Sequence, residues 1–268
     1  MRSVKQLSNL TGRRALVTGG AGHIGLATTE TLLELGASVG LLDVHGAACR
    51  ERARALGRAH GTRRVISMSC DLRDERASRA ATREAIAALG GLDILVHSAA
   101  YVGSARLNGW AVPFERQTVE AWDAALRVNL TSAFVLVQEA RRALSASGRG
   151  TVVFLDSIYG AVGPDLRLYA GTPMVNPVAY GVSKGGLLQL TRYLATLLAP
   201  RVRVNAISPG GVARGQPRVF RERYEARTPL RRMAREEDVK GAIAYLASDL
   251  SAYVTGHNLV VDGGWTAW

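Results

Sequence analysis

The stretch "RALVTGGAGHIG" (Arg14–Gly25) joins a short apolar run to a glycine-rich turn, and an amphipathic segment follows it through Leu35. A strand, a Gly-rich turn and a helix in this order form the context that a dinucleotide-binding site requires. Glycines let backbone amides approach a pyrophosphate, and the helix N-terminus adds partial positive charge. A Gly-rich turn can also be a plain strand-to-helix connection, but at this place nucleotide binding is the favoured interpretation.

The same alternation of short apolar runs and helical segments continues to the end of the chain. After the first strand at 14–20, six more are predicted at 38–44, 63–72, 92–100, 150–157, 202–210 and 257–264. Helices are predicted after Asp74 and over 119–146, 178–198 and 236–248, and a loop over 101–117. Short β-rich runs alternating with helices are typical of βαβ units. The sequence therefore predicts an α/β fold with a Rossmann-type, doubly wound parallel sheet of about seven strands. Helices should cover both faces, in one domain over residues 1–268.

Length and composition restrict the class of protein. The chain has 268 residues, 47% of them hydrophobic, which is enough for one well-buried core. No apolar run is long enough to span a bilayer, and "MRSVKQLSNLTGRR" lacks the apolar centre of a signal peptide. The two cysteines, Cys49 and Cys70, suit a reducing compartment. We expect a cytoplasmic protein without a membrane partner.

The net charge of +12 raises the question of a nucleic-acid partner. The basic residues are almost all arginines, spread along the chain without any nucleic-acid-binding motif, so we expect no such partner. Lysine occurs only at Lys5, Lys184 and Lys240. The use of lysine at position 184 therefore needs its own explanation.

Seven short motifs follow one another in a specific order. They are the turn at 18–25, "CDL" (70–72), "RVNLTSAF" (127–134), "FLDSIYG" (154–160), "YGVSK" (180–184), "SPGGV" (208–212) and "VVDGG" (260–264). With these motifs the chain resembles the short-chain dehydrogenase/reductase family, in its single-domain form, over nearly its whole length. The resemblance implies an NAD-dependent oxidoreductase that transfers hydride between a secondary alcohol and a ketone. It also implies a homotetramer or homodimer, and no metal.

Tyr180 and Lys184 suit the proton transfer that hydride chemistry requires. A free tyrosine, with a pKa of about 10, is a poor base at neutral pH, but a nearby ammonium stabilises its phenolate. Four-residue spacing places both side chains on one face of a helix. Tyr159 and Tyr169, upstream, have no lysine at that spacing. Tyr180 is therefore the predicted general acid/base.

Two further catalytic residues are expected. Ser157 would donate a hydrogen bond to the substrate oxygen, and no other serine lies between Ile158 and Ala179. By resemblance, Asn129 would hold a water in a proton relay through Lys184. The plainer alternatives for the set are a helix-surface tyrosine, a strand-end serine and an asparagine at a helix kink.

The end of the second strand bears on the choice of cofactor. Asp43 there could accept hydrogen bonds from the ribose hydroxyls of NAD and would repel the 2′-phosphate of NADP, or it could be a helix N-cap or a solvated acid. We expect NAD to be preferred, with NADP less favoured. Asp71 would accept from the adenine amino group or cap the next helix. The expected cofactor site comprises Thr18, Gly19, Gly22, His23, Ile24, Gly25, Asp43, Val44, Asp71, Leu72, Ser98, Ala99, Ala100, Tyr180, Lys184, Pro209, Gly210 and Val212.

The chain departs from the family pattern at several positions. His23 stands where a glycine is usual, "HSAA" (97–100) replaces "NNAG", and Arg214 replaces a threonine. The turn looks more like the sugar-nucleotide epimerase and dehydratase branch, so an epimerase or dehydratase using bound NAD is an alternative. A catalytically silent nucleotide-sensing protein is another. His97 itself is expected to be a packed histidine and not a catalyst.

The C-terminal third suggests a substrate class. Residues 169–184 and 208–234 resemble bacterial sugar-modification dehydrogenases, including those of flagellin glycosylation, which implies a carbohydrate or polyol substrate. The Arg-rich stretch at about 211–235 is predicted to form a lid over the substrate. Its arginines could bind an anionic substrate or form a solvated basic face. The apolar end "GGWTAW" (263–268) could cover a subunit interface or its own core.

Overall fold

The computed structural model describes residues 1–103 and 105–268 and places seven parallel strands in a single sheet. The strand order is β3-β2-β1-β4-β5-β6-β7. The strands are β1 (Arg14–Thr18), β2 (Ser38–Asp43), β3 (Val65–Ser69), β4 (Ile94–His97), β5 (Gly150–Leu155), β6 (Val202–Pro209) and β7 (Asn258–Val261). The predicted doubly wound α/β fold is confirmed. The order reverses between β1 and β4, and in such sheets ligands bind at the carboxyl ends beside that reversal.

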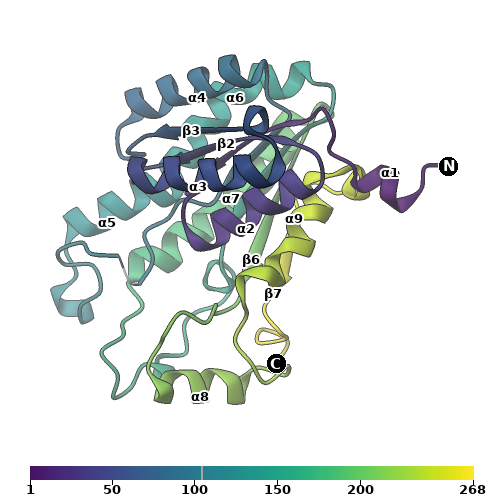
Figure 1. Ribbon diagram of the computed structural model, residues 1–268. Coiled ribbons are helices and arrows are strands. Elements are labelled where there is room, and N and C mark those ends of the chain that lie inside the picture. Colours follow the sequence, from purple (N-terminus) through teal and green to yellow (C-terminus); the bar gives the residue numbers. More distant parts are fainter. Residues whose placement is uncertain (104) are drawn as a thin grey trace.

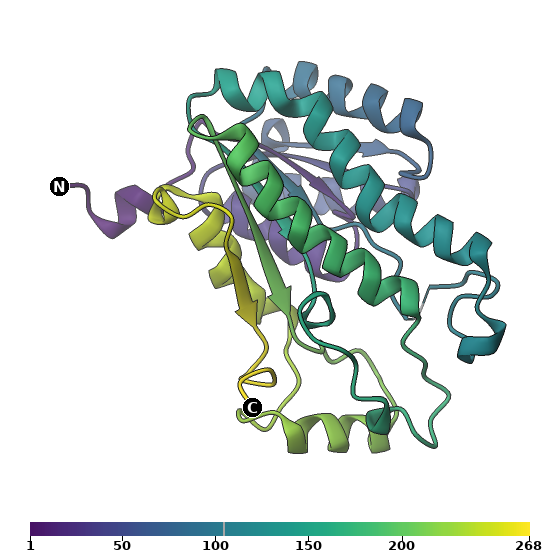
Figure 2. The same cartoon turned by 180° about the vertical axis from the view of Figure 1, so that it is seen from behind.

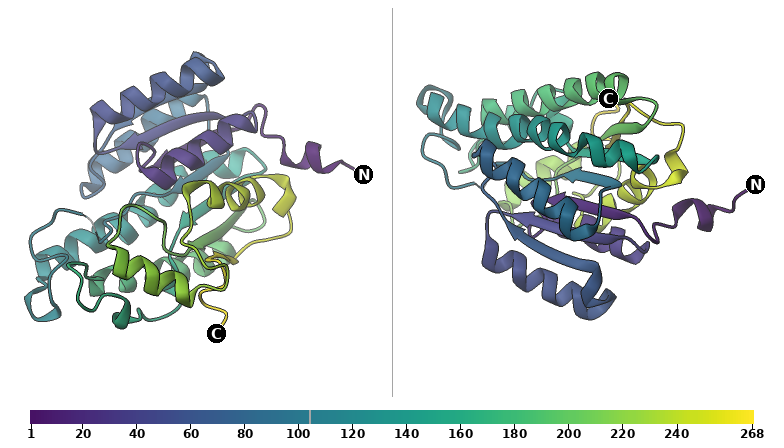
Figure 3. Two further views of the ribbon diagram at one scale, coloured as in Figure 1. Left: turned by 60° about the horizontal axis from the view of Figure 1, so that its bottom comes forward. Right: turned by 90° about the horizontal axis from the view of Figure 1, so that it is seen from above.

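Helices cover both faces of the sheet (Figures 1 and 3). One face carries α4 (Glu75–Leu89), α6 (Ser132–Ala146) and α7 (Val178–Leu198), and the other carries α2 (His23–Glu34), α3 (Gly46–His60) and α9 (Lys240–Ala247). The central strands β4 and β5 are buried along their whole length, which explains their uninterrupted apolar sequences. Within the described part of the chain, no helix has the length and apolar character needed to cross a membrane.

The structure corrects several predicted elements. The helix predicted over 119–146 is α5 (Val119–Leu126), a π-helical turn (Arg127–Thr131) and α6. The predicted helix 236–248 begins as a 3₁₀ turn (Glu236–Val239) before α9. The strand predicted over 63–72 is shorter, because a 3₁₀ turn (Thr62–Arg64) precedes it. Three helices were not predicted: α1 (Val4–Ser8), α3 and α8 (Arg218–Arg227).

A third layer lies beyond the carboxyl ends of the strands. Seen from behind, α8 and the chain that precedes α7 lie together below the ends of β6 and β7 (Figure 2). They share a small aromatic cluster with the C-terminal segment, in which the buried residues are Ile158, Leu168, Phe220, Tyr224, Met233 and Trp265. Of the two roles suggested for the apolar C-terminus, the structure shows that Trp265 covers the chain's own core.

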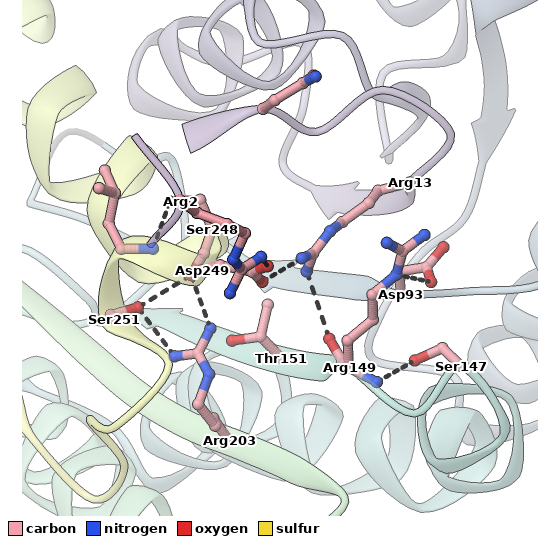
Figure 4. Close-up of polar contacts among 12 residues, drawn as sticks. Arg2, Arg13, Asp93, Ser147, Arg149, Thr151, Arg203, Ser248, Asp249 and Ser251 are labelled. Carbon is pink, nitrogen blue, oxygen red and sulfur yellow. Dashed lines mark hydrogen bonds and ion pairs between the residues drawn. The ribbon is translucent and has the colours of Figure 1, made fainter. Parts of the chain in front are cut away.

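At the opposite, amino-terminal edge of the sheet, a buried and a half-buried arginine bind groups near the helix ends (Figure 4). Arg203 donates to the carbonyl oxygens of Leu246 and Ser248 at 3.1 Å each, and so binds the carboxyl end of α9. Arg13, 2% exposed, pairs with Asp249. Through these contacts the arginines join strands to helix ends at the amino-terminal edge of the sheet, away from its carboxyl edge.

Candidate active site

The Gly-rich turn lies directly against the end of β4. Gly19 has φ +64°, and a Cβ there would lie 2.9 Å from the Cα of Ala99. A Cβ on Gly25 would lie 2.0 Å from the carbonyl oxygen of Gly19. Both positions therefore require glycine. Gly22 is the N-cap of α2, so the free amides of His23 and Ile24 open the helix beside this turn. The turn fits the pyrophosphate of a dinucleotide cofactor.

Thr18 links the turn to the segment after β4. Thr18 and His97 are paired in register across β1 and β4. The Thr18 hydroxyl oxygen accepts from the backbone amides of Ser98 and Ala99 at 3.2 Å each, and Oγ1 lies 2.9 Å from His97 Nδ1. Because the oxygen accepts twice, its single proton goes to Nδ1, and the neutral imidazole carries its proton on Nε2. Ala100 follows in the same segment.

His97 is a packed histidine, as expected. Burial and the nearby Lys184 ammonium lower the pKa of His97 to about 3, against the carbonyls of Val128 and Asn129, which raise it. Its Nε2 makes no hydrogen bond of good geometry with the described residues. His97 therefore stays neutral, and it lies between Thr18 of the Gly-rich turn and the carbonyls of Val128 and Asn129.

Asp43 supports the Gly-rich turn from the end of β2. Its carboxylate is 8% exposed and accepts from the backbone amides of Ala21 at 3.2 Å and His45 at 3.0 Å. The α3 helix begins after His45 without a side-chain cap, so Asp43 is not its N-cap. Val44, which follows, is exposed.

Asp71 also has a partner within the chain. Arg73 donates to its two carboxylate oxygens at 2.6–3.1 Å, which holds the pKa of Asp71 below its usual value. The cap of α4 is Asp74, whose side chain accepts from the amide of Ala77. The capping role considered for Asp71 therefore belongs to Asp74. Leu72 is buried beneath this segment.

Ser157, Tyr180 and Lys184 gather at the carboxyl end of β5. Lys184 is 3% exposed, and its Nζ lies 5.8 Å from the centroid of the Tyr180 ring. That nitrogen donates to the carbonyl oxygen of Leu155 at 2.7 Å. The Ser157 hydroxyl accepts from the amide of Tyr159 at 3.2 Å. Its proton therefore remains available for an oxygen in the site.

Burial controls the ionisation of Tyr180. It raises the pKa of Tyr180 to about 12, and the Ser157 hydroxyl and Arg214 offset only part of this, while Asp156 adds to it. The expected lowering by Lys184 is not the dominant effect in this arrangement, where the ammonium binds the Leu155 carbonyl. Burial also lowers the pKa of Lys184, and Asp156 opposes that change.

Asn129 is buried in the π-helical turn, and its side chain faces the chain at Tyr101. It accepts from the Tyr101 amide at 2.7 Å and donates to the Tyr101 carbonyl at 3.3 Å and to the Ser183 hydroxyl at 3.0 Å. Ser183 in turn donates to the carbonyl of Tyr180 at 2.8 Å. The Asn129 side chain thus fixes the loop after β4 against α7.

The two tyrosines that lack a lysine partner pack together. The hydroxyls of Tyr159 and Tyr169 lie 3.1 Å apart, and burial raises the pKa of both. Tyr159 packs edge-on against Trp265, and Tyr169 packs against Phe220 of α8. These contacts define the course of the segment between Ser157 and Tyr180, which runs against α8.

The "SPGGV" segment lies between β7 and Tyr224. Pro209 ends β6, and Gly210 donates to the carbonyl of Val261 at 3.0 Å. A Cβ on Gly210 would lie 3.0 Å from the Tyr224 hydroxyl. Val212 pairs with Ala234 in a single β-bridge, which joins the two ends of the predicted lid.

The arginines of the predicted lid all have acceptors within the chain. The Oε1 atom of Glu236 lies 3.2 Å from Arg214 Nε and 3.3 Å from His23 Nδ1, and so connects the lid to the Gly-rich turn. Arg227 pairs with Asp165 at 2.8 Å. The remaining arginines contact carboxylates or backbone carbonyls: Arg218, Arg221, Arg223, Arg231, Arg232 and Arg235. The described residues contain no cluster of His, Cys, Asp and Glu side chains that could hold a metal.

Comparisons with known proteins find similar sequences over nearly the whole chain. A family model described as enoyl-(acyl carrier protein) reductase matches residues 19–266. Cis-4-hydroxycyclohexanecarboxylate dehydrogenase of Sinomonas cyclohexanicum is 38% identical over 260 residues, covering 95% of this chain and 97% of that protein. D-threitol dehydrogenase of Mycolicibacterium smegmatis is 33% identical over 265 residues, covering 96% and 94%.

Solved structures are similar over the same length. A short-chain type dehydrogenase/reductase from Mycobacterium marinum has a TM-score of 0.86 and 30% identity, with 100% of both chains covered. An NADPH-dependent 3-quinuclidinone reductase from Rhodotorula rubra has a TM-score of 0.85 and 28% identity, covering 100% of this chain and 96% of that one. With a family model and relatives matched over nearly its whole length, the chain belongs to the short-chain dehydrogenase/reductase family.

Proposed function

We propose that this protein is an NAD-dependent oxidoreductase that interconverts a secondary alcohol and a ketone. The observation that carries the proposal is the meeting of Ser157, Tyr180 and Lys184 at the carboxyl end of β5. The Gly-rich turn lies at the end of the same sheet, beside β4. A bound nicotinamide would supply the carbon that accepts or donates the hydride.

The side chains have complementary roles in moving the proton. Ser157 donates its free hydroxyl proton to the substrate oxygen, because its lone pair already binds the Tyr159 amide. Tyr180 exchanges a proton with that oxygen. With a pKa raised to about 12, the phenol is neutral at pH 7, which is the form that protonates a ketone during reduction. Oxidation of the alcohol should therefore be favoured at higher pH.

Asp43 supports a preference for NAD over NADP. Its two oxygens are acceptors only, and each has a lone pair left after binding one backbone amide. Such an acceptor can bind ribose hydroxyls and repels a phosphate. The NADPH dependence of one structural neighbour shows why this preference needs its own test.

The substrate class is proposed to be a polyol, sugar or related carbohydrate. D-threitol dehydrogenase supports a polyol, and the hydroxycyclohexanecarboxylate enzyme supports a ring alcohol. Residues 211–235 are proposed to act as a lid over this substrate, since the segment is tied at both ends and contacts the turn through Glu236.

The enzyme is further proposed to be a cytoplasmic homotetramer or homodimer. Buried free thiols at Cys49 and Cys70 suit a reducing compartment. Exposed apolar side chains on α6 and α7 support self-association: Phe134, Val182, Tyr193 and Leu197.

The direct test is a panel of polyols, sugars and cyclic alcohols assayed with NAD and NADP by the absorbance of the reduced cofactor. Robust NADH formation on one of them supports the proposal. Turnover of a nucleotide sugar without net NADH would instead support the epimerase or dehydratase alternative. Tight NADH binding with no turnover across the panel would support a silent sensor.

A further inference from the structure

A buried carboxylate lies next to the catalytic serine and has no role in the chemistry described above. Asp156 is 4% exposed, between Leu155 and Ser157. Its Oδ1 makes no hydrogen bond of good geometry with the described residues. An acid buried in this way is costly unless a cation or hydrogen bonds compensate it.

The other oxygen, Oδ2, belongs to a short hydrogen-bonded chain. The Ser208 hydroxyl lies 3.1 Å from Asp156 Oδ2 and 2.8 Å from Asn258 Oδ1. One hydroxyl has one proton, so it cannot donate to both. If Asp156 is ionised, Ser208 donates to it and the Asn258 amide turns its nitrogen to Ser208. If Asp156 is neutral, it donates to Ser208, which donates to Asn258. The chain can therefore accommodate either protonation state.

The compensating cation is Lys184. Its Nζ donates to the carbonyl oxygen of Leu155, the group that forms the peptide bond to Asp156. Each residue opposes the effect of burial on the other: Asp156 raises the pKa of Lys184, and Lys184 lowers that of Asp156.

Gly160 allows this close arrangement. A Cβ at position 160 would lie 2.5 Å from Asp156 Oδ2 and 2.9 Å from the backbone carbonyl of Lys184. Any side chain there would separate the carboxylate from α7. The turn after Ser157 is thus shaped around the carboxylate.

We propose that Asp156 is a positioning residue of this site, and that its carboxylate keeps Lys184 protonated and sets the pH range in which Tyr180 exchanges its proton. The inference rests on the proposed function. Other charged or titratable groups facing Tyr180 are Tyr159 and Arg214, while His97 faces Lys184 from β4.

The sign of the effect follows from charge. Burial raises the pKa of Asp156 to about 6, against Lys184, the Ser157 amide and the Ser208 hydroxyl, so the group is mostly ionised at neutral pH. A neighbouring negative charge raises the pKa of both a phenol and an ammonium. Removing it should therefore lower the pKa values of Tyr180 and Lys184 together. The pH profile of alcohol oxidation should move as a whole to lower pH.

The first experiment measures kcat against pH for alcohol oxidation in the wild type, Asp156→Asn and Asp93→Asn. Asp93 is the matched control, a buried acid at the start of β4 paired with Arg14. We expect Asp156→Asn to shift the profile down by about one pH unit, and Asp93→Asn to leave it in place. A folded Asp156→Asn enzyme with an unmoved or upward-shifted profile would overturn the proposal.

The second experiment needs no turnover. The infrared band of the protonated Asp156 carboxyl, identified as the band lost in Asp156→Asn, is titrated in the wild type, Lys184→Met and Ser208→Ala. Both substitutions should raise its midpoint above the wild-type value. Unchanged midpoints in both variants would contradict the coupling. If Asp156→Asn does not fold, the absence of any carboxyl band that moves in both Lys184→Met and Ser208→Ala would contradict it equally.

The two experiments separate failure of the inference from failure of the proposed function. If the midpoint of the Asp156 titration rises in the variants but no alcohol is oxidised, the Asp156–Lys184 coupling stands and the proposed dehydrogenase activity is refuted. Active dehydrogenation with an unmoved Asp156→Asn profile would refute the role of Asp156 alone.

Discussion

Lys184 reaches from α7 to the end of β5, where its ammonium donates to the carbonyl oxygen of Leu155 at 2.7 Å. The side chain is almost wholly enclosed, at 3% exposure. A compact ammonium fits this enclosure, whereas a guanidinium is wider and has a fixed planar set of donors. This contact explains why a chain that otherwise favours arginine uses lysine at position 184.

Lys184→Arg should therefore lower kcat by at least about 100-fold, because the larger group cannot keep both its carbonyl contact and its place beside Tyr180. Lys240→Arg is the matched control, since Lys240 pairs with Glu30 and Glu34 at the surface. Steady-state kinetics give kcat for both variants. Comparable kcat values in the two would contradict the requirement for lysine at position 184.

Asp43→Ser should narrow the preference for NAD over NADP. The wild type should favour NAD by more than tenfold in kcat/KM, or about 1.4 kcal/mol. Serine removes the negative charge that repels the 2′-phosphate. Asp74→Ser is the control, because serine can also cap α4. A ratio of kcat/KM values that is the same in Asp43→Ser and the wild type would contradict this assignment.

Thr18→Val should destabilise the protein, because it removes the acceptor of the Ala99 amide and leaves the Ser98 amide with only its 3.3 Å bond to the Thr18 carbonyl. The expected loss is about 1–3 kcal/mol in the free energy of unfolding. Thr28→Val offers a matched comparison, since the buried Thr28 hydroxyl has no partner among the described residues. Urea unfolding of both variants should show a lower free energy of unfolding only for Thr18→Val. Equal free energies of unfolding in the two variants would contradict a stabilising role for the hydrogen bonds to the Thr18 hydroxyl.

His97 should make the protein less stable in acid. Burial lowers its pKa in the folded state to about 3, from about 6.5 in the unfolded chain. Its contribution is therefore present above the unfolded pKa and is lost as pH falls from about 6.5 towards 3. The difference in unfolding free energy between wild type and His97→Asn should fall over this window by up to about 1.4 kcal/mol per pH unit. A difference independent of pH would show that His97 is not buried neutral.

Much of the fold could be predicted because its signals are local. Strands β4 and β5 are continuous apolar runs, and the Gly-rich turn has a fixed relation to β1. The α3 helix was missed because it buries only a narrow stripe among many polar residues, and its N-cap makes no side-chain hydrogen bond. The π-helical turn at 127–131 was missed because a shift in backbone hydrogen bonding leaves no pattern of side chains.

The site was predictable only where spacing along the chain carries the information. The four-residue interval from Tyr180 to Lys184 lies within one helix, and the structure places both side chains together. The pairing of Asp156 with Ser208 joins residues that are distant in sequence, on β-strand ends brought together by the sheet. No local pattern indicated that contact, or the packing of Tyr159 against Tyr169.

The central claim is that Tyr180, and no neighbouring tyrosine, exchanges the substrate proton. The most direct measurement is kcat for the best alcohol substrate in Tyr180→Phe and Tyr159→Phe, with NADH affinity determined by fluorescence in both. Tyr180→Phe should lose at least about 100-fold in kcat and still bind NADH, while Tyr159→Phe retains turnover. Near wild-type turnover in Tyr180→Phe, with Tyr159→Phe inactive, would contradict the proposed mechanism.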